Sequence, residues 1–310
     1  MISTSETSVR RLRGLAAAAA IAALVTACTS SGEDSSVTAT SSSPTSGVSL
    51  PVTPVTTTLL DPGAEPRSTV TSVRSGNQSV QLSTRSTVTQ QIDDQAVQDF
   101  STPELTLPLT ATDMDSSSDT VNLRLGKATS ADQRLTDALA PAEGSAAGLT
   151  MTDAGAITAL TITPSDETQD AARAAIEQAL NQAVYRSVSY PDAEIGVGAV
   201  WTVEQQVISG VTLNQVTTAT LRSRDGDRLT IDLRIDQTPE TTTLELPDNA
   251  GSLAIDSYTM TGTGTLEVDA DKPLPLSGEV TVGGKQQYSD PEGSTVLRQD
   301  ISDTVRWTAP

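Results

Sequence analysis

Histidine is absent from the 310-residue chain, and cysteine occurs once, at Cys28. Without histidine there can be no Ser-His-Asp triad, no histidine acid–base catalysis and none of the usual zinc ligand sets. Lysine occurs only at Lys127, Lys272 and Lys285, and none of them follows a serine at the spacing of a Ser-x-x-Lys nucleophile. A phosphate-binding G-x-x-x-x-G-K-[ST] loop is also missing. We therefore expect no enzyme activity, no metal ion and no cofactor.

Aromatic residues are scarce, at 2% of the chain, and the formal net charge is −20. Single-stranded nucleic acids stack their bases on aromatic side chains, and a strongly negative surface repels their phosphates. The same charge repels an anionic membrane surface. The composition therefore excludes nucleic acid as a partner. It also indicates that any contact with a membrane does not depend on a basic surface patch.

Carboxylates are the remaining candidates for chemistry, and three pairs stand out: Asp113/Asp115, Asp225/Asp227 and Asp269/Asp271. Each pair lies in an expected turn, and the EF-hand loop pattern is absent. Glycosidase sites also hold sugars against aromatic faces, which this chain hardly offers. We interpret the pairs as solvated turn residues.

The first 27 residues have the layout of a secretory signal peptide. Arg10, Arg11 and Arg13 precede an apolar run from Leu15 to Val25. A run of about eleven residues is roughly 16 Å of helix, whereas a bilayer core needs about 20 residues. General secretion is expected first, because the residues after Arg10-Arg11 fit the twin-arginine motif poorly. Removal of the signal takes away three arginines and Glu6, which changes the net charge from −20 to −22.

The residues Val25-Thr26-Ala27-Cys28 resemble the bacterial lipobox. The resemblance implies cleavage before Cys28 and attachment of diacylglycerol and palmitate-type acyl chains to that residue. Two or more acyl chains suffice for stable anchoring. The chain would then be an extracytoplasmic lipoprotein on the outer face of the cytoplasmic membrane. The alternative is an ordinary signal peptide followed by a chance cysteine.

Two regions with different composition follow the signal. Residues 28–66 are rich in Ser, Thr, Pro and Gly, which predicts a disordered tether with a reach of roughly 35 Å. From Arg67 onward apolar and polar residues alternate, as in half-buried strands. The clearest run is Leu229, Ile231, Leu233 and Ile235, joined to the strand before it by an Asp225-Gly226 hairpin turn.

One long helix is expected over residues 167–187, with Asp166 as its N-cap. Its apolar stripe consists of Ala172, Ile176, Ala179, Leu180, Ala183 and Val184. A short helix at 131–140 also fits the pattern. Strands joined by hairpin-length links predict an α+β fold, mainly antiparallel β, in which a large curved sheet or open half-barrel packs against the helix. We expect one domain over 67–310; the alternative is two β lobes, 67–163 and 197–310, joined by the helix.

A short motif follows the expected helix and contains Pro191, Gly196, Gly198 and Trp201 in Pro-Asp-Ala-Glu-Ile-Gly-Val-Gly-Ala-Val-Trp. It resembles the signature of a family of exported bacterial lipoproteins with no assigned activity. Arginine far outnumbers lysine, which indicates a GC-rich genome and an actinobacterial source. We interpret the glycines as permitting a sharp turn into the next strand, and Trp201 as a core residue beside Val203.

Two functions remain open for such a protein. The first is binding of a lipid or another apolar ligand in a groove between helix and sheet, by analogy with half-barrel lipoprotein carriers. The second is a structural or interaction role in the cell envelope, with a solid core and an envelope protein as partner. An enclosed apolar void of ~300 Å³ or more would favour the first.

Overall fold

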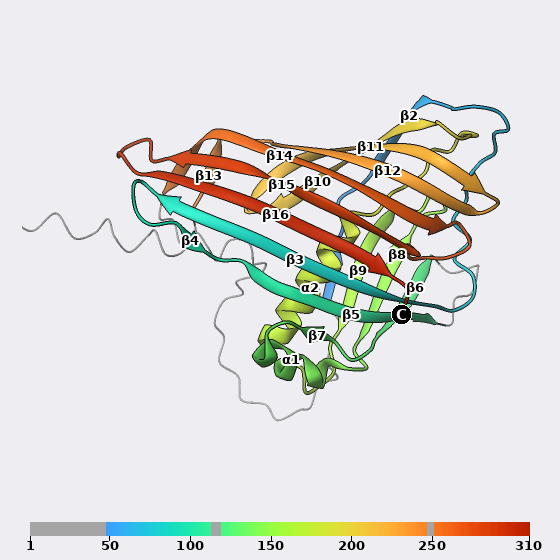
Figure 1. Cartoon of the computed structure of the whole chain (residues 1–310), viewed down its shortest axis with the longest axis horizontal. Helices are drawn as coiled ribbons and strands as arrows, with labels where there is room; N and C mark the ends of the chain where they lie inside the picture. Colours follow the sequence, from blue (N-terminus) through green and yellow to red (C-terminus); the bar gives the residue numbers. More distant parts are fainter. Residues whose placement is uncertain (1–47, 113–118, 247–250) are drawn as a thin grey trace, which may run out of the picture.

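Alternating apolar and polar residues form antiparallel strands throughout the residues that this computed structural model describes, 48–112, 119–246 and 251–310 (Figure 1). In β3 every second residue from Val80 to Gln90 is buried, and β12 repeats the pattern from Leu229 to Gln237. The strands are β1 Val48–Pro51, β2 Thr56–Asp61, β3 Gln78–Ile92, β4 Gln98–Asp99, β5 Thr102–Thr112, β6 Thr120–Leu125, β7 Thr129–Ser130, β8 Ala146–Met151, β9 Ile157–Thr163, β10 Val200–Ser209, β11 Val211–Asp225, β12 Arg228–Pro239, β13 Thr243–Glu245, β14 Ser252–Asp269, β15 Ser277–Ser289 and β16 Val296–Thr308.

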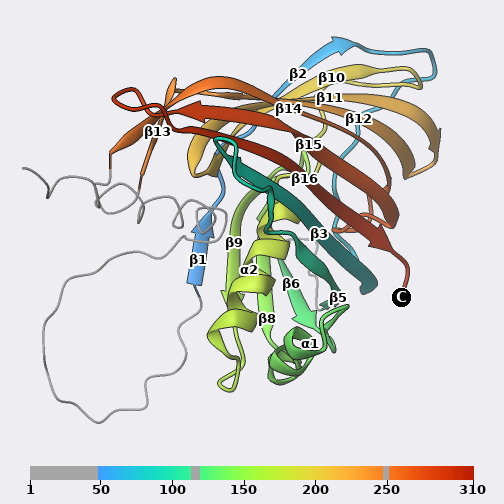
Figure 2. The same cartoon turned by 60° about the vertical axis from the view of Figure 1, so that its left-hand side comes forward.

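All described strands belong to one open sheet, in the order β1-β9-β8-β6-β5-β3-β16-β15-β14-β12-β11-β10-β2, with β4, β7 and β13 on side branches. The pairing of β3 with β16 joins the strands before the helices to those after them. In Figure 2 one part of the sheet, made of β16, β15, β14, β12, β11, β10 and β2, arches across the top. The strands β6, β8 and β9 descend below it. The expected mainly antiparallel, open β-sheet is therefore confirmed.

Glycines lie where the paired antiparallel strands β14 and β15 approach each other closely. A Cβ on Gly284 would lie 1.5 Å from the carbonyl oxygen of Thr259, and one on Gly264 would lie 2.4 Å from that of Glu279. No side chain fits at such a separation, so glycine permits the tight approach of the two backbones. We relate the curl of the sheet to these positions.

The expectation of one long helix over 167–187 is wrong. The described residues contain two α-helices, α1 (Gln133–Leu139) and α2 (Asp170–Val184), and a 3₁₀ turn, η2 (Ala140–Ala142), follows α1. The chain at 165–168 instead forms a turn closed by Thr168 N–H donating to Ser165 O, and Gln169 is the N-cap in place of Asp166. The apolar stripe of α2 is buried as expected and packs against β3, β5 and β9 inside the curve of the sheet.

The predicted tether is wrong for residues 48–66. β1 pairs with β9 and β2 pairs with β10, so consecutive strands of the chain occupy the two opposite edges of the sheet. The link between them is fixed at both sides, because Val52 N–H donates to Thr158 O and the Thr53 hydroxyl bonds to Gln206 O. Threonine favours strands when a partner strand is available, which composition alone does not reveal. Residues 28–47 lie outside the described residues.

Candidate functional site

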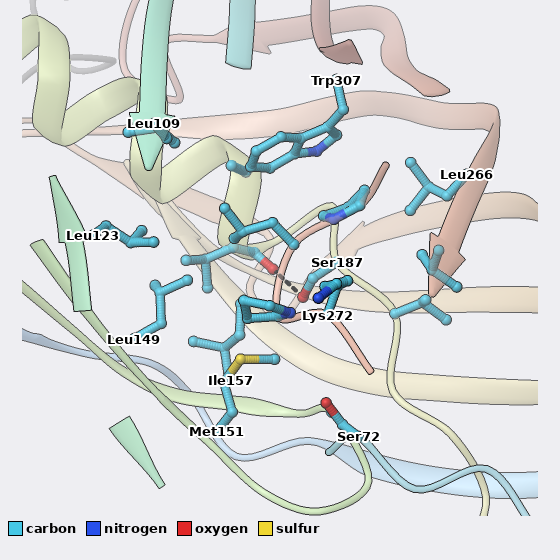
Figure 3. Close-up of a pocket in the computed structure, with 18 of the residues that line it drawn as sticks. Ser72, Leu109, Leu123, Leu149, Met151, Ile157, Ser187, Leu266, Lys272 and Trp307 are labelled. Atoms are coloured by element: carbon cyan, nitrogen blue, oxygen red, sulfur yellow. Dashed lines mark hydrogen bonds between the residues drawn. The ribbon is translucent and has the colours of Figure 1, made fainter. Parts of the chain in front are cut away.

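A small pocket lies where α2 meets the sheet (Figure 3). Three side chains of α2, Leu180, Ala183 and Val184, form one wall. Sheet residues form the facing walls: Leu109, Leu123, Leu149, Ile157, Leu266 and Trp307. These residues come from β5, β6, β8, β9, β14 and β16, so the pocket lies at the centre of the fold. We call it the helix pocket.

Loops rather than strands form the remaining side of the helix pocket. Ser72 belongs to residues 67–77, here called the cover segment, and Lys272 to Pro275 belong to the β14–β15 loop. Backbone bonds hold the two together, with Val73 N–H donating to Ala270 O at 2.8 Å and Ser75 N–H donating to Asp271 O at 2.7 Å. No named strand contributes to this side, although Ser68 of the cover segment forms an isolated antiparallel bridge with Ile195.

Arg74 fastens the cover segment to the β8–β9 turn. Its side chain is 4% exposed; Nη1 donates to Thr152 O at 2.8 Å, and Nη2 lies 3.2 Å from Asp153 Oδ1. Among the described residues its Nε has no hydrogen-bond partner. A buried donor without a partner costs roughly 1–3 kcal/mol, so this contact is weaker than its burial suggests.

The polar groups of the helix pocket are few. In Figure 3, Ser72, Ser187 and Lys272 stand apart from the leucine wall of Leu109, Leu123 and Leu149. Ser187 Oγ donates to Val184 O at 2.7 Å, and Lys272 Nζ donates to Ser75 O at 3.1 Å.

Tyr190 is the remaining titratable residue of this lining. Burial raises the pKa of its hydroxyl above the ordinary value, and the nearby negative charge of Asp269 raises it further. The phenol is therefore neutral at physiological pH. Among the described polar groups of this lining, Ser187 and Lys272 each donate to a backbone carbonyl, and no hydrogen bond pairs a serine with a base.

The helix pocket has a volume of about 60 Å³. Ordinary ligand pockets measure about 300–1,000 Å³, and a water molecule takes up about 30 Å³. The void is thus smaller than the size that would favour a carrier. In this conformation it has room for roughly two waters and not for an acyl chain.

A second group of polar residues, buried or partly buried, comes from β3, β11, β12, β15 and β16 and from Arg186 just after α2. Its members are Ser86, Gln90, Arg186, Gln215, Gln237, Gln286, Gln299 and Asp303, here called the polar belt. On β16, Gln299 and Asp303 lie between Leu297 of one hydrophobic cluster and Val305 of another. The polar belt therefore separates two apolar cores on the same concave face.

Four glutamines of the polar belt are hydrogen-bonded in pairs across strands, whereas Gln286 accepts from the Tyr288 hydroxyl on its own strand. Gln299 Nε2 donates to Gln90 Oε1 at 3.1 Å, and Gln237 Nε2 donates to Gln215 Oε1 at 2.8 Å. Arg186 Nη1 also donates to Gln215 Oε1, at 3.2 Å. Partners on neighbouring strands align only in one register, so these bonds favour the observed pairing.

Arg186, which is buried, and Asp303, which is partly buried, carry the charges of the polar belt. Burial lowers the pKa of Arg186, and the charge of Asp303 opposes that shift. Burial raises the pKa of Asp303, while the hydrogen bond from Ser86 and the charge of Arg186 lower it by a smaller amount. Arg186 Nε has no partner among the described residues. In the sequence, Gln299 and Asp303 only interrupt the alternation of Leu297, Ile301 and Val305.

The residues singled out in the sequence are dispersed. Cys28 and the lipobox residues Val25, Thr26 and Ala27 lie outside the described residues, as do Asp113 and Asp115. Asp225/Asp227 lie at the β11–β12 hairpin and Asp269/Asp271 where β14 ends. Nowhere in residues 48–112, 119–246 and 251–310 do three or more acidic, histidine or cysteine side chains gather as metal ligands.

The motif from Pro191 to Trp201 packs against the chain that follows β2. Gly196 N–H donates to Pro62 O at 2.9 Å, and Ala64 N–H donates to Val197 O at the same distance. Gly198 has a φ of +86°, a conformation that glycine adopts readily. Trp201 is fully buried and donates from Nε1 to Ser189 O at 2.8 Å. None of these residues lines the helix pocket.

Lys272 and Ser72 were not among the sequence candidates. Both lie in segments between strands, where neither alternation nor a motif marks them. The rarity of lysine, with three in the chain, is the signal that could have drawn attention to Lys272.

No helix among the described residues is long and apolar enough to span a bilayer. Comparison of the chain with models of known protein families finds no match, and comparisons with curated proteins and with solved structures find none either.

Proposed function

We propose that this protein is a non-catalytic lipoprotein, anchored through Cys28 outside the cytoplasm, which takes up an apolar ligand in the helix pocket. One observation supports the proposal of an apolar ligand. The helix pocket has an apolar lining, which comes from six strands and α2, with loops on one side. Concave apolar sites with a few convergent polar groups are the usual form of a small-molecule site.

Uptake of a ligand requires the helix pocket to widen from its volume of about 60 Å³. The strand walls are fixed by continuous ladders, whereas the cover segment is held by separate contacts. These are backbone bonds of Ser68, Ser72, Val73 and Ser75 and side-chain bonds of Arg74, Arg224 and Lys272. Each such bond contributes roughly 0.5–1.5 kcal/mol net. Displacement of the cover segment is therefore the least costly way to admit a ligand.

Native mass spectrometry tests the ligand proposal. The wild-type protein, extracted from its own membrane in mild detergent, should carry an apolar molecule. Ala183→Leu, which places a larger side chain in the pocket wall, should lose it. Ala174→Leu, on the exposed face of the same helix, is the matched control and should retain it. Absence of any bound molecule from the wild type would count against ligand uptake.

The anchor has a separate test. Cells fed with radiolabelled palmitate should incorporate label into the wild-type protein and not into Cys28→Ser. Label on the Cys28→Ser chain, or none on the wild type, would remove the anchor from the proposal.

The small volume of the helix pocket favours a second candidate, a structural or interaction lipoprotein with a solid core. Two hydrophobic clusters and the hydrogen-bonded polar belt occupy the concave face. Crosslinking in whole cells should then recover an envelope protein, and recovery of lipid alone would reject this candidate.

A further inference from the structure

Lys272 is a cation at the apolar helix pocket without a carboxylate partner. Its side chain is partly buried, and no Asp or Glu oxygen of the described residues lies within 4.0 Å of its Nζ. The other two lysines differ, because Lys285 Nζ lies 2.8 Å from Asp300 and Lys127 is exposed and lines no part of the helix pocket. An ammonium group that borders an apolar surface is stabilised most by a charge-assisted hydrogen bond to an anion.

The hydrogen-bonding capacity around Lys272 is only partly used. An ammonium group has three donors, and one of them bonds to Ser75 O. Ser72 Oγ forms no hydrogen bond within the described residues, and Ser187 Oγ, which donates to Val184 O, still has lone pairs to accept. Three polar groups with unused hydrogen-bonding capacity thus line a mainly apolar pocket.

The other charged residues near Lys272 are already engaged, so Lys272 is the cation available to a ligand in the helix pocket. Arg74 is engaged with Thr152 and Asp153. Asp269 Oδ1 accepts from the backbone N–H of Asp271, which turns that carboxylate toward its own loop. A cation beside an apolar pocket favours a ligand whose head is negative, although the net charge of −20 repels anions at long range.

We propose that the helix pocket binds an amphiphile with one alkyl chain and an anionic head, with the chain between α2 and the sheet and the head on Lys272 Nζ. This inference rests on the proposed uptake of an apolar ligand. We specify a single alkyl chain because strand ladders fix the other walls, so the pocket widens only on its loop side. A carboxylate and a phosphate monoester or diester meet the same requirement, so a fatty acid and a lysophospholipid are the two sources to distinguish.

Lys272 also connects the ligand to the cover. Its Nζ bonds to Ser75 O of the cover segment at 3.1 Å, and a Cβ on Gly76 would lie 3.4 Å from the same nitrogen. An anionic head that draws Nζ away from Ser75 removes one of the bonds that hold the cover segment. The head is thereby recognised by a group that also helps to keep the pocket closed.

Equilibrium titration with defined ligands tests the inference on the full mature chain in nanodiscs of neutral phosphatidylcholine. The probes are a fluorescent C18 fatty acid, the C18 alcohol with the same chain, and lysophosphatidylglycerol as competitor. Lys272→Met should weaken fatty-acid binding about tenfold or more and leave alcohol binding within twofold, because a charge-assisted bond is lost only with the charged head. Lys272→Arg should restore most of the affinity, and Lys127→Met is the matched control that should change nothing.

Each outcome separates the inference from the proposed function. If acid and alcohol bind equally well and Lys272→Met affects neither, the anionic head is wrong and apolar ligand uptake survives. If Lys272→Met weakens both probes equally, the residue has a structural role, and the inference is again overturned. If neither probe binds the wild type while the protein stays folded, both proposals fail. Competition by lysophosphatidylglycerol at lower concentration than fatty acid identifies a phosphate as the preferred head.

Discussion

The carboxyl group of Asp303 lies on the concave face of β16, and Ser86 Oγ donates to it at 2.5 Å. Its pKa is raised from the usual value, mainly by burial. A carboxyl group with a raised pKa in the folded state stabilises the protein fully below its unfolded pKa of about 3.9 and loses that contribution as the pH rises through the folded value. Ionisation of Asp303 is therefore expected to weaken the fold.

We predict that Asp303→Asn removes this dependence. The free energy of unfolding of the wild type minus that of Asp303→Asn should fall as the pH rises above about 4, with a slope of at most about 1.4 kcal/mol per pH unit for a single proton. Urea denaturation at a series of pH values measures the difference. Asp236→Asn, on the solvent side of β12, is the control for loss of a carboxylate at a more exposed position. A difference that rises with pH would contradict a raised pKa at Asp303.

Gly196 is a residue at which backbone packing leaves no room for a side chain. A Cβ at this position would lie 1.8 Å from the carbonyl oxygen of Ala64. Gly196→Ala must therefore displace the segment after β2, and overpacking of this kind costs roughly 1–3 kcal/mol or more. Gly226→Ala is the control, because nothing lies within 4 Å of its Cβ and only its φ of +61° is strained. Thermal unfolding should show a larger loss for Gly196→Ala, and equal losses would show that the clash relaxes freely.

At the scale of elements, α2 uses alanine to approach the sheet closely. Ala172 is fully buried among core residues, whereas Ala174, two residues further along the same helix, is exposed. We predict that Ala172→Leu destabilises the fold by about 1–3 kcal/mol and that Ala174→Leu stays within about 0.5 kcal/mol of the wild type. Chemical denaturation of both variants measures the contrast. Similar values for the two would mean that α2 is loosely packed.

The elements that follow from the sequence are those in which burial alone sets the pattern. The alternation of Leu229 to Ile235 predicts a strand and its inward face, and the stripe of α2 predicts which side of the helix is buried. β1 and β2 escape prediction because their stability comes from pairing with β9 and β10, which are distant in the chain. The ends of α2 differ because a turn at 165–168 competes with the helix.

Of the candidate site, the sequence predicts only a groove between helix and sheet. The helix pocket lies between α2 and the sheet but measures about 60 Å³, so a ligand groove there stays a prediction. Lys272 and Ser72 reach it through loops whose paths are set by tertiary contacts, such as the bond from Val73 to Ala270. Local periodicity contains no information on such contacts, so those residues are visible only in the assembled fold.

For the whole molecule, the pairing of β3 with β16 makes the sheet continuous between the strands that precede the helices and those that follow them. The register runs from Leu297↔Ile92 to Thr308↔Gln81 along the full length of β16. Two lobes separated by α2 would unfold independently, whereas strands within one ladder are expected to unfold together. The two tryptophans, on β10 and β16, both report on the second part of the chain.

This position of the tryptophans permits a direct test of cooperativity. Leu107 on β5 is fully buried, and Leu107→Ala should cost about 2–5 kcal/mol. If the sheet unfolds as one unit, tryptophan fluorescence and far-ultraviolet circular dichroism of Leu107→Ala should shift together to the same lower urea midpoint. Leu233→Ala on β12 should shift both probes in the same way. If Leu107→Ala left the fluorescence transition in place while part of the circular dichroism signal was lost earlier, β5 and its neighbours would form a separate lobe, and the ladder between β3 and β16 would not couple the two parts.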